Sequence, residues 1–576
     1  TGIVHCAPSH GPDDFNLCLK NNIPSLYTVD NAGLYTKEIP YFNNTHIFKA
    51  DPIVIEKLKE HNKLLKSDKL NHSYPHSWRS KAPLIYRATP QWFISMQKNE
   101  LRNKAIKAIN DTVFYPSKGK DRLLSMVEGR PDWCVSRQRV WGVPLPIFIN
   151  KKTKEPLKDK KVIDRIASIY EKQGSDCWFT DDAKIFLGDE YNPNDYEKLS
   201  DIVEVWFDSG STHSFVLEKR KDLKWPADMY LEGSDQHRGW FHSSLLESCG
   251  TRGRAPFKSI LSHGFVVDGK GMKMSKSMGN VISPDEILKN YGADILRVWV
   301  ASSDYAEDLR IDKSILTQHA ESYRKIRNTF RFILGNLKDT YEKQNFDQLN
   351  VEEFNELEQY ILHKIFHISK SVEINLKNYN FHKLYKELLS FCSLDLSSFY
   401  FDIRKDVLYC DDLNSKKRKN CVIVLNIILE SLLKWFAPIL VFTTDEIYSL
   451  ISKDKKNIHE YSFVKAPNNW ENKKLNEKWE QLFKIKQEAN IAIEAKRSSK
   501  EIGSSLEAQI KLTVNKSKIE LLKNLDLAEY FITSKAEIVL SENDEMKIEV
   551  KKAKGNKCPR CWKILEKSCT RCSSLI

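Results

Sequence analysis

The pattern of apolar residues changes near residue 311, and this change constrains the possible fold more than any other feature of the chain. Before it, strand-like runs such as 202–207 alternate with helix-like runs such as 284–291, which predicts an α/β domain. From about 311 to 465, apolar residues such as Ile326 and Phe330 recur at helical spacing, which predicts a helix bundle. Because 576 residues exceed what one hydrophobic core covers, we expect these patterns to fold as separate domains.

We expect no membrane-spanning segment and no signal peptide. The most apolar stretch, 422–451, is interrupted by charged residues such as Glu430 and Asp445, whereas a spanning helix needs roughly 20 uncharged residues. The N-terminus lacks a basic region followed by an apolar one. We therefore predict a cytoplasmic protein in a reducing compartment, where disulfides are rare.

The basic charge balance leaves two interpretations open. The chain has 90 Lys and Arg against 77 Asp and Glu, a net charge of +13. A polyanionic partner would explain this balance, and so would an AT-rich genome that inflates the lysine content. The concentration of basic residues in 551–576 against a single acid, Glu566, favours nucleic acid as the partner.

Four cysteines near the C-terminus form the strongest metal-binding pattern. They follow the spacing C-x2-C-x7-C-x2-C and are Cys558, Cys561, Cys569 and Cys572. Two such pairs can place four thiolates at the corners of a tetrahedron, the geometry that zinc prefers. Two disulfides or idle thiols are the alternatives, and a reducing compartment disfavours the disulfides. Four thiolates leave no open coordination position, so one Zn²⁺ with a structural role is predicted.

A segment rich in glycine and lysine, 269–280, is the second chemical signal. Lys273, Ser275 and Lys276 lie between glycines, and a flexible loop of this kind can oppose the charge that develops on a polyphosphate. The segment departs from the P-loop pattern, because Gly271 stands where that motif needs Ser or Thr. On the residues alone, a solvated basic loop is equally consistent.

The run Lys273-Met274-Ser275-Lys276-Ser277 resembles the second signature of the class I aminoacyl-tRNA synthetases, and the whole chain resembles the isoleucyl-tRNA synthetases among them. The resemblance covers nearly the full length. The other segments that carry it are 1–14, 72–76 with Trp78-Arg79, 87–93, 130–139, 205–213, 232–240 and the four-cysteine module.

This resemblance implies a multidomain fold. The implied regions are a remnant of a β-rich editing domain at 1–69, an incomplete α/β Rossmann-type catalytic domain at 70–310 with a polar insertion at about 150–200, an α-helical anticodon-binding bundle at 311–465, an α/β junction region at 466–550 and a zinc module at 551–576. The implied partners are tRNA(Ile), isoleucine, and ATP with Mg²⁺ as a substrate. We expect a monomer.

The resemblance also implies a ligase that activates isoleucine as the adenylate, transfers it to tRNA and edits mischarged valine. Lys276, assisted by Lys273 and Ser275, would stabilise the ATP phosphates in the transition state. The other implied site residues are Glu232, Gly233, Asp235 and Gln236 for ATP and the adenylate, Trp206 and Trp240 for the isoleucine side chain, and His5 and Asp14 for editing. Without the resemblance, these residues would be interpreted as a helix cap, core tryptophans and a structural turn.

The first class I signature, His-x-Gly-His, is missing. None of the 15 histidines starts it, and Trp240 follows His237-Arg238-Gly239 where the second His would stand. We therefore expect this chain to be the C-terminal part of a longer enzyme and to be inactive on its own. Two alternatives remain open: a valyl or leucyl enzyme with the same chemistry, and a tRNA-binding scaffold without catalysis.

Overall fold

The computed structural model describes residues 2–77, 80–337, 340–452, 456–543 and 545–573. Thr1, Trp78 and Arg79, which belong to the segments named above, lie outside the described residues. The chain divides into two compact units. Unit 1 comprises Thr1–Asp111, Arg122–Ala227 and His237–Pro256, and unit 2 comprises Thr112–Asp121, Asp228–Gln236 and Phe257–Ile576.

The first part of unit 1 is not β-rich, so the prediction of a β-rich remnant at 1–69 is wrong for the described residues. Its regular elements are the helices α1 (Pro12–Lys20) and α2 (Ala50–Glu60). Strand-like pairing is limited to isolated bridges, Val29 with Tyr35 and Leu34 with His46. The apolar runs here are short and separated by turns, and no run is long enough to sustain a ladder.

The rest of unit 1 contains helices packed beside short two-stranded pairings. The helices are α3 (Leu101–Asn110), the later part of α4 (Lys118–Glu128), α8 (Val205–Gly210), a π-helix (His213–Leu217) and α9 (Trp240–Arg252). The antiparallel pairs are β1 (Phe93–Ile94) with β3 (Trp133–Cys134) and β4 (Ser136–Arg137) with β7 (Ile202–Val203). The predicted strand 202–207 therefore ends at Val203, because the chain turns into α8 two residues later.

The polar insertion folds around a small core of its own. Its elements are β5 (Phe148–Asn150), α5 (Lys160–Gln173), α6 (Cys177–Thr180), α7 (Ala183–Leu187) and β6 (Tyr196–Lys198), with β5 antiparallel to β6. Trp178 is fully buried between Phe148 and Phe186. The Lys198 ammonium caps this cluster by donating to the carbonyl oxygen of Trp178 at 2.7 Å.

Unit 2 begins with a parallel sheet of order β2-β9-β8, formed by Val113–Tyr115, Ser259–His263 and Tyr230–Gly233. The central strand β9 is buried at Ile260, Leu261 and Ser262, as expected of a parallel strand. A second parallel pair joins β10 (Val266–Asp268) to β11 (Leu309–Ile311). The helices α10 (Pro284–Tyr291) and α11 (Ala293–Ser302) lie between them in sequence. Parallel strands with intervening helices are typical of the predicted α/β class.

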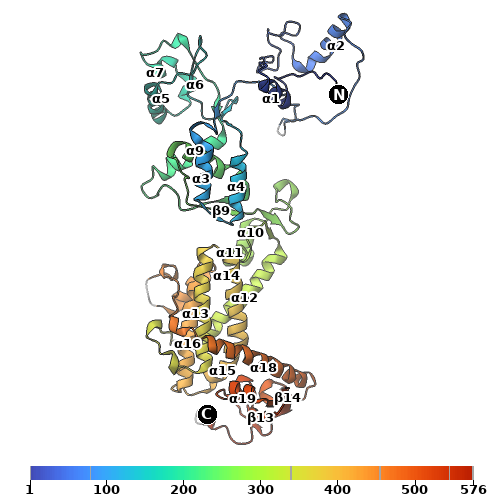
Figure 1. The fold of residues 1–576 in the computed structure, drawn as a ribbon. Coiled ribbons are helices and arrows are strands. Elements are labelled where there is room, and N and C mark those ends of the chain that lie inside the picture. The colour runs from blue at the N-terminus through green and yellow to red at the C-terminus, as the bar shows by residue number, and fades with distance from the viewer. Residues whose placement is uncertain (1, 78–79, 338–339, 453–455, 544, 574–576) are drawn as a thin grey trace. The chain divides into compact units, whose positions relative to one another are not determined.

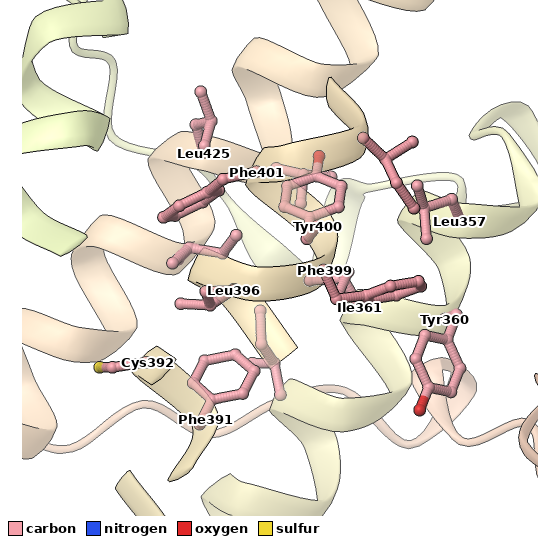
Figure 2. Packing of buried hydrophobic residues seen from close by; sticks show 14 of the residues in the cluster. Leu357, Tyr360, Ile361, Phe391, Cys392, Leu396, Phe399, Tyr400, Phe401 and Leu425 are labelled. Carbon is pink, nitrogen blue, oxygen red and sulfur yellow. The ribbon is translucent and has the colours of Figure 1, made fainter. Parts of the chain in front are cut away.

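The region predicted to be a helix bundle is helical. Its elements are α12 (Lys313–Leu337), α13 (Glu356–Lys377), α14 (Phe381–Ser390), the π-helix η9 (Phe391–Tyr400), α15 (Phe401–Cys410), α16 (Lys416–Phe436) and α17 (Val441–Ile451) (Figure 1). We call these helices the bundle. Figure 2 shows rings of η9, such as Phe391 and Phe399, packed with residues of α13 and α16.

A further helix and a small sheet follow the bundle and share its core. Helix α18 (Lys473–Ser498) precedes a three-stranded sheet of order β13-β12-β14, formed by Lys535–Leu540, Ala508–Val514 and Lys547–Lys552, with α19 (Lys516–Leu522) and α20 (Leu527–Tyr530) in the connection. The buried guanidinium of Arg404 joins this region to the bundle, because it bonds to Glu358 on α13 and Glu529 on α20. Of the helices described, none combines the length and the apolar character that crossing a membrane would require.

Candidate active site and metal centre

The residues predicted to bind the adenylate lie at the carboxyl end of the parallel sheet. Strand β8 ends at Gly233, opposite His263 at the end of β9. Glu232 and Asp235 lie there, and Gln236 donates its side-chain N–H to Asp235 at 3.1 Å. Gly233 is buried, and a Cβ on it would lie 2.7 Å from Asp235 Oδ1. In open α/β sheets, ligands bind outside the carboxyl ends of the strands, so this edge suits a nucleotide.

A loop that follows β10, residues 268–280, carries the predicted catalytic lysines, and we call it the lysine loop. Two side chains that the sequence analysis did not single out close it. Asp268 accepts hydrogen bonds from the backbone N–H of Met272 at 2.8 Å and from the side chain of Asn280 at 2.9 Å. Asn280 in turn accepts from the backbone N–H of Ser275 at 2.9 Å. The bond from Asn280 and those from backbone N–H groups lower the pKa of Asp268, so it is an anion at neutral pH.

The two signature lysines project from this closed loop without a counter-ion. Lys273 and Lys276 are exposed, and within the described part of the chain neither ammonium has a hydrogen bond or an ion pair. The Ser275 hydroxyl accepts from the backbone N–H of Met278 at 3.3 Å and begins the 3₁₀ turn that contains Lys276. The loop therefore holds two free positive charges on an ordered backbone, an arrangement suited to polyphosphate.

The two tryptophans predicted for the isoleucine pocket lie on packed helices of unit 1. Trp206 is on α8 and remains 40% exposed, whereas Trp240 begins α9. The indole N–H of Trp240 donates to the carbonyl oxygen of Ser209, also on α8, at 3.0 Å. This bond ties the two helices together three residues from Trp206. Whether both rings contact one ligand stays a prediction.

A half-buried carboxyl group on α9 faces α8, and no sequence signal distinguished it. Burial and the neighbouring Asp208 raise the pKa of Glu247 on α9 to about 9. Its Oε1 has no hydrogen-bond partner among the described residues, and a Cβ on Gly210 of α8 would lie 2.2 Å from it. Glu247 is therefore neutral at physiological pH. Its carboxyl group fits against α8 because Gly210 has no side chain there.

The predicted editing residues lie close in the chain, but one of them has a structural role. Asp14, in the first turn of α1, accepts a hydrogen bond from the backbone N–H of Ala7 at 2.8 Å. Ala7, which donates this bond, is two positions after His5 in the sequence. His5 itself is exposed. The hydrogen bond from Ala7 to Asp14 stabilises a turn before α1. An editing role for His5 or Asp14 remains a prediction.

The four cysteines meet in unit 2 with a geometry that fits a metal. Their sulfur atoms all lie within 4.8 Å of one another, and the Sγ atoms of Cys561 and Cys569 are 3.9 Å apart. A tetrahedral zinc with Zn–S bonds of about 2.3 Å requires sulfur separations of about 3.8 Å. The strands β15 (Asn556–Lys557) and β16 (Ile564–Leu565) frame the first pair, and α21 (Thr570–Ser573) carries Cys572.

The chemistry of this donor set also suits a cation. Burial favours a protonated Cys558, but backbone N–H groups of Cys561 and Arg560 lower its pKa to about 7. Burial raises the pKa of Cys561 to about 11. Buried thiols at this spacing would repel one another as thiolates, and a divalent cation removes that cost. Arg571, through Asp406 and Asp411, fastens the cluster to the end of α15.

Comparisons with known proteins agree with this organisation. The family described as tRNA synthetases class I (I, L, M and V) matches residues 26–312, and the anticodon-binding domain of tRNA ligase matches residues 358–512. An isoleucine–tRNA ligase of Pelagibacter ubique is 66% identical over 99% of this chain. Those of Zymomonas mobilis and Gluconobacter oxydans are 43% and 44% identical over 100% and 98% of it.

The chain spans 63%, 63% and 60% of the lengths of these three relatives. The two family matches cover the region with the parallel sheet and the lysine loop and most of the bundle. A catalytic region and an anticodon-binding region thus follow one another along the chain, in the order that the sequence predicted. The chain belongs to the class I tRNA synthetases, in the family that groups the I, L, M and V enzymes.

Proposed function

We propose that the chain serves in an isoleucine–tRNA ligase. In the first step an isoleucine carboxylate oxygen attacks the α-phosphorus of ATP, the bond to the β-phosphate oxygen breaks and pyrophosphate leaves. In the second step a ribose hydroxyl of tRNA(Ile) attacks the acyl carbon and AMP leaves. The observation that carries this proposal is a pair of uncompensated lysines on a closed loop, in a chain 66% identical to a protein named isoleucine–tRNA ligase.

The chemical step needs no nucleophile from the protein. Lys276 would oppose the negative charge that grows on the β- and γ-phosphates as pyrophosphate departs, with Lys273 beside it and Ser275 as a hydrogen-bond donor. Because Asp268 and Asn280 already close the loop, little backbone ordering is left to occur at the moment of reaction. Mg²⁺ would arrive with ATP as part of the substrate.

Substrate binding is assigned to the edge of the sheet and to the tryptophans. Glu232 and Asp235 would accept from ribose hydroxyls or from the isoleucine ammonium, and buried Gly233 would let the adenylate approach the backbone. Trp206 and Trp240 would enclose the isoleucine side chain. An apolar pocket discriminates poorly against valine, a limit for which isoleucyl enzymes are themselves the usual illustration. Hydrolytic editing is therefore included, with His5 and Asp14 as candidates.

The remaining assignments concern the C-terminal half and the N-terminal segment. Cys558, Cys561, Cys569 and Cys572 would hold one structural Zn²⁺, because four thiolates leave it no open position. The bundle would read unstacked anticodon bases. We also propose that residues 1–69 derive from an editing domain and that the protein is a cytoplasmic monomer.

Amino-acid-dependent exchange of labelled pyrophosphate into ATP tests this proposal, using protein expressed from the complete coding region. We expect exchange with isoleucine, weaker exchange with valine and none with leucine. Preference for valine or leucine would assign the chain to one of those enzymes. Binding of tRNA(Ile) without exchange for any of the three would favour a scaffold without catalysis.

A further inference from the structure

The two helices that carry the predicted pocket tryptophans each place further residues on the same face as the tryptophan. On α8, Gly210 follows Trp206 by four positions. On α9, Ser243 and Glu247 follow Trp240 by three and seven positions. Residues at these spacings lie on one face of a helix. A contact between Gly210 and α9 therefore involves the faces that also bear the two indoles.

Gly210 is buried where α8 packs on α9. A Cβ built on it would overlap Oε1 of Glu247 and would lie 2.9 Å from the hydroxyl oxygen of Ser243. Ser243 is only 4% exposed, so its side chain has little room to withdraw. The helices can lie this close together only because position 210 has no side chain. We call Gly210, Ser243 and Glu247 the α8–α9 contact.

One hydrogen bond links the α8–α9 contact to the predicted pocket. The indole N–H of Trp240 donates to the carbonyl oxygen of Ser209 at 3.0 Å, and Ser209 immediately precedes Gly210. A displacement of Gly210 away from α9 would therefore also displace the acceptor that orients the Trp240 ring. Because α8 is only six residues long, Trp206 at its other end would move with it.

We propose that Gly210, Ser243 and Glu247 are positioning residues that set the spacing of α8 and α9 and, through it, the width of the pocket for the amino acid side chain. The inference rests on the proposed function, because it deepens the assignment of Trp206 and Trp240. An apolar pocket distinguishes isoleucine from valine by one methylene, which is worth roughly 10–200-fold in kcat/KM. A gap of about 0.5–1 Å already forfeits much of such a contact, so the spacing of the helices should determine the preference.

A glycine-to-alanine substitution on each helix tests this, in protein expressed from the complete coding region. Pyrophosphate exchange gives kcat/KM for isoleucine, valine and leucine. Gly210→Ala should lower the preference for isoleucine over valine about tenfold and make leucine a substrate. Alanine is the better helix former, so the backbone of α8 is not weakened. The matched control is Gly250→Ala on α9, where a Cβ would make an ordinary contact with Leu101 at 3.6 Å. This variant should keep the wild-type preference.

Two double variants separate the size of Glu247 from its charge. Glu247→Ala added to Gly210→Ala removes the atoms that the new methyl group would overlap, so it should recover most of the preference. Glu247→Gln added to Gly210→Ala removes the charge but keeps the size, so it should not recover the preference.

Ser243→Val enlarges the same contact from the α9 side and leaves α8 unchanged. It should also lower the preference for isoleucine, and it provides the test if Gly210→Ala does not fold. All amino acids are measured on one preparation of each variant, so an inactive fraction cancels from the ratio of their kcat/KM values. Loss of folded protein alone would therefore not change the preference.

An unchanged preference in Gly210→Ala and Ser243→Val would overturn the proposal, and so would an equal loss in Gly250→Ala. Recovery by Glu247→Gln as complete as that by Glu247→Ala would overturn the assignment to side-chain size. Failure of the proposed function is a different result, namely wild-type protein that prefers valine or leucine. The α8–α9 contact would then be tested by the change of that preference in the same variants.

Discussion

The bundle and the lysine loop are held in place in opposite ways. In the bundle, η9 buries Phe391, Leu396 and Tyr400 against α13 and α16 (Figure 2). In the lysine loop, no residue from 268 to 280 is fully buried, and the backbone is held by Asp268 and Asn280. The bundle keeps its shape through the removal of apolar area from water, whereas the loop does so through a few hydrogen bonds.

This difference indicates where stability and chemistry reside. A bundle side chain that is removed leaves a cavity, but it leaves the charges near the substrate unchanged. A lysine removed from the loop leaves no cavity, because Lys273 and Lys276 are exposed, but it removes a charge from the place where phosphates would be bound. If stability and catalysis depend on different regions, a bundle variant should lose stability but keep its rate of adenylate formation. A lysine-loop variant should lose rate but keep its stability.

The largest expected effect concerns the four-cysteine module, which has little apolar core of its own. Removal of the metal by a chelator, or Cys569→Ser, should unfold this module, since structural zinc binding is worth on the order of 10 kcal/mol. The bundle should keep its helical circular dichroism. Elemental analysis should find one zinc per chain in the wild type and none in the variant. The matched control is Cys6→Ser, a similarly half-buried cysteine outside the cluster, which should retain the metal. Zinc-free wild-type protein from metal-replete medium would refute the assignment.

The next effect is a cavity in the bundle. Phe391 is 1% exposed and its ring lies 6.3 Å from that of Trp435, so Phe391→Ala should lower the free energy of unfolding by about 3–5 kcal/mol. Leu394→Ala, on the same π-helix but at a position 63% exposed, should cost well under about 1 kcal/mol. Urea denaturation measures both. Equal losses in the two variants would show that η9 is not the packed core described here.

A smaller effect is expected from the hydrogen bonds that order the lysine loop. Asp268→Ala removes the acceptor for Met272 N–H and for Asn280, so the loop must be ordered during the reaction. In protein expressed from the complete coding region, we expect adenylate formation to slow about tenfold, without a change in the melting temperature. Asn280→Ala should have a similar effect, and the double variant should not be additive, because both residues act through one contact. Full additivity would mean that they act separately.

The smallest effect is a pH dependence of the bundle. Burial, with the charges of His367 and Lys364, lowers the pKa of His363 to about 4, and its Nδ1 accepts from the backbone N–H of Asn472. As the pH falls from about 6.5 towards 4, the unfolded chain binds a proton that the folded chain does not, so the free energy of unfolding declines over this range. His363→Asn should remove this decline, whereas the exposed His367→Asn should not. Urea midpoints at pH 7 and pH 4.5 measure it.

The features that could be predicted from the sequence are the local ones. The cysteine spacing and the glycine-lysine run are continuous motifs, and the bundle follows from helical periodicity. Two other features depend on partners distant in the chain. Strand-like residues after Val203 become α8, which packs on α9. No local pattern pairs Asp268 with Asn280, which the fold brings together.

The most direct test of the central claim uses protein expressed from the complete coding region and compares Lys276→Ala with Lys270→Ala, an exposed lysine of the same loop. Rapid-quench measurement of isoleucyl-adenylate formation, with isoleucine affinity and melting temperature measured in parallel, separates chemistry from binding and folding. We predict that Lys276→Ala slows adenylate formation about 10²–10³-fold with isoleucine affinity and stability unchanged, and that Lys270→Ala leaves all three near the wild type. Loss of isoleucine affinity with an unchanged rate, or equal losses in the two variants, would contradict the account.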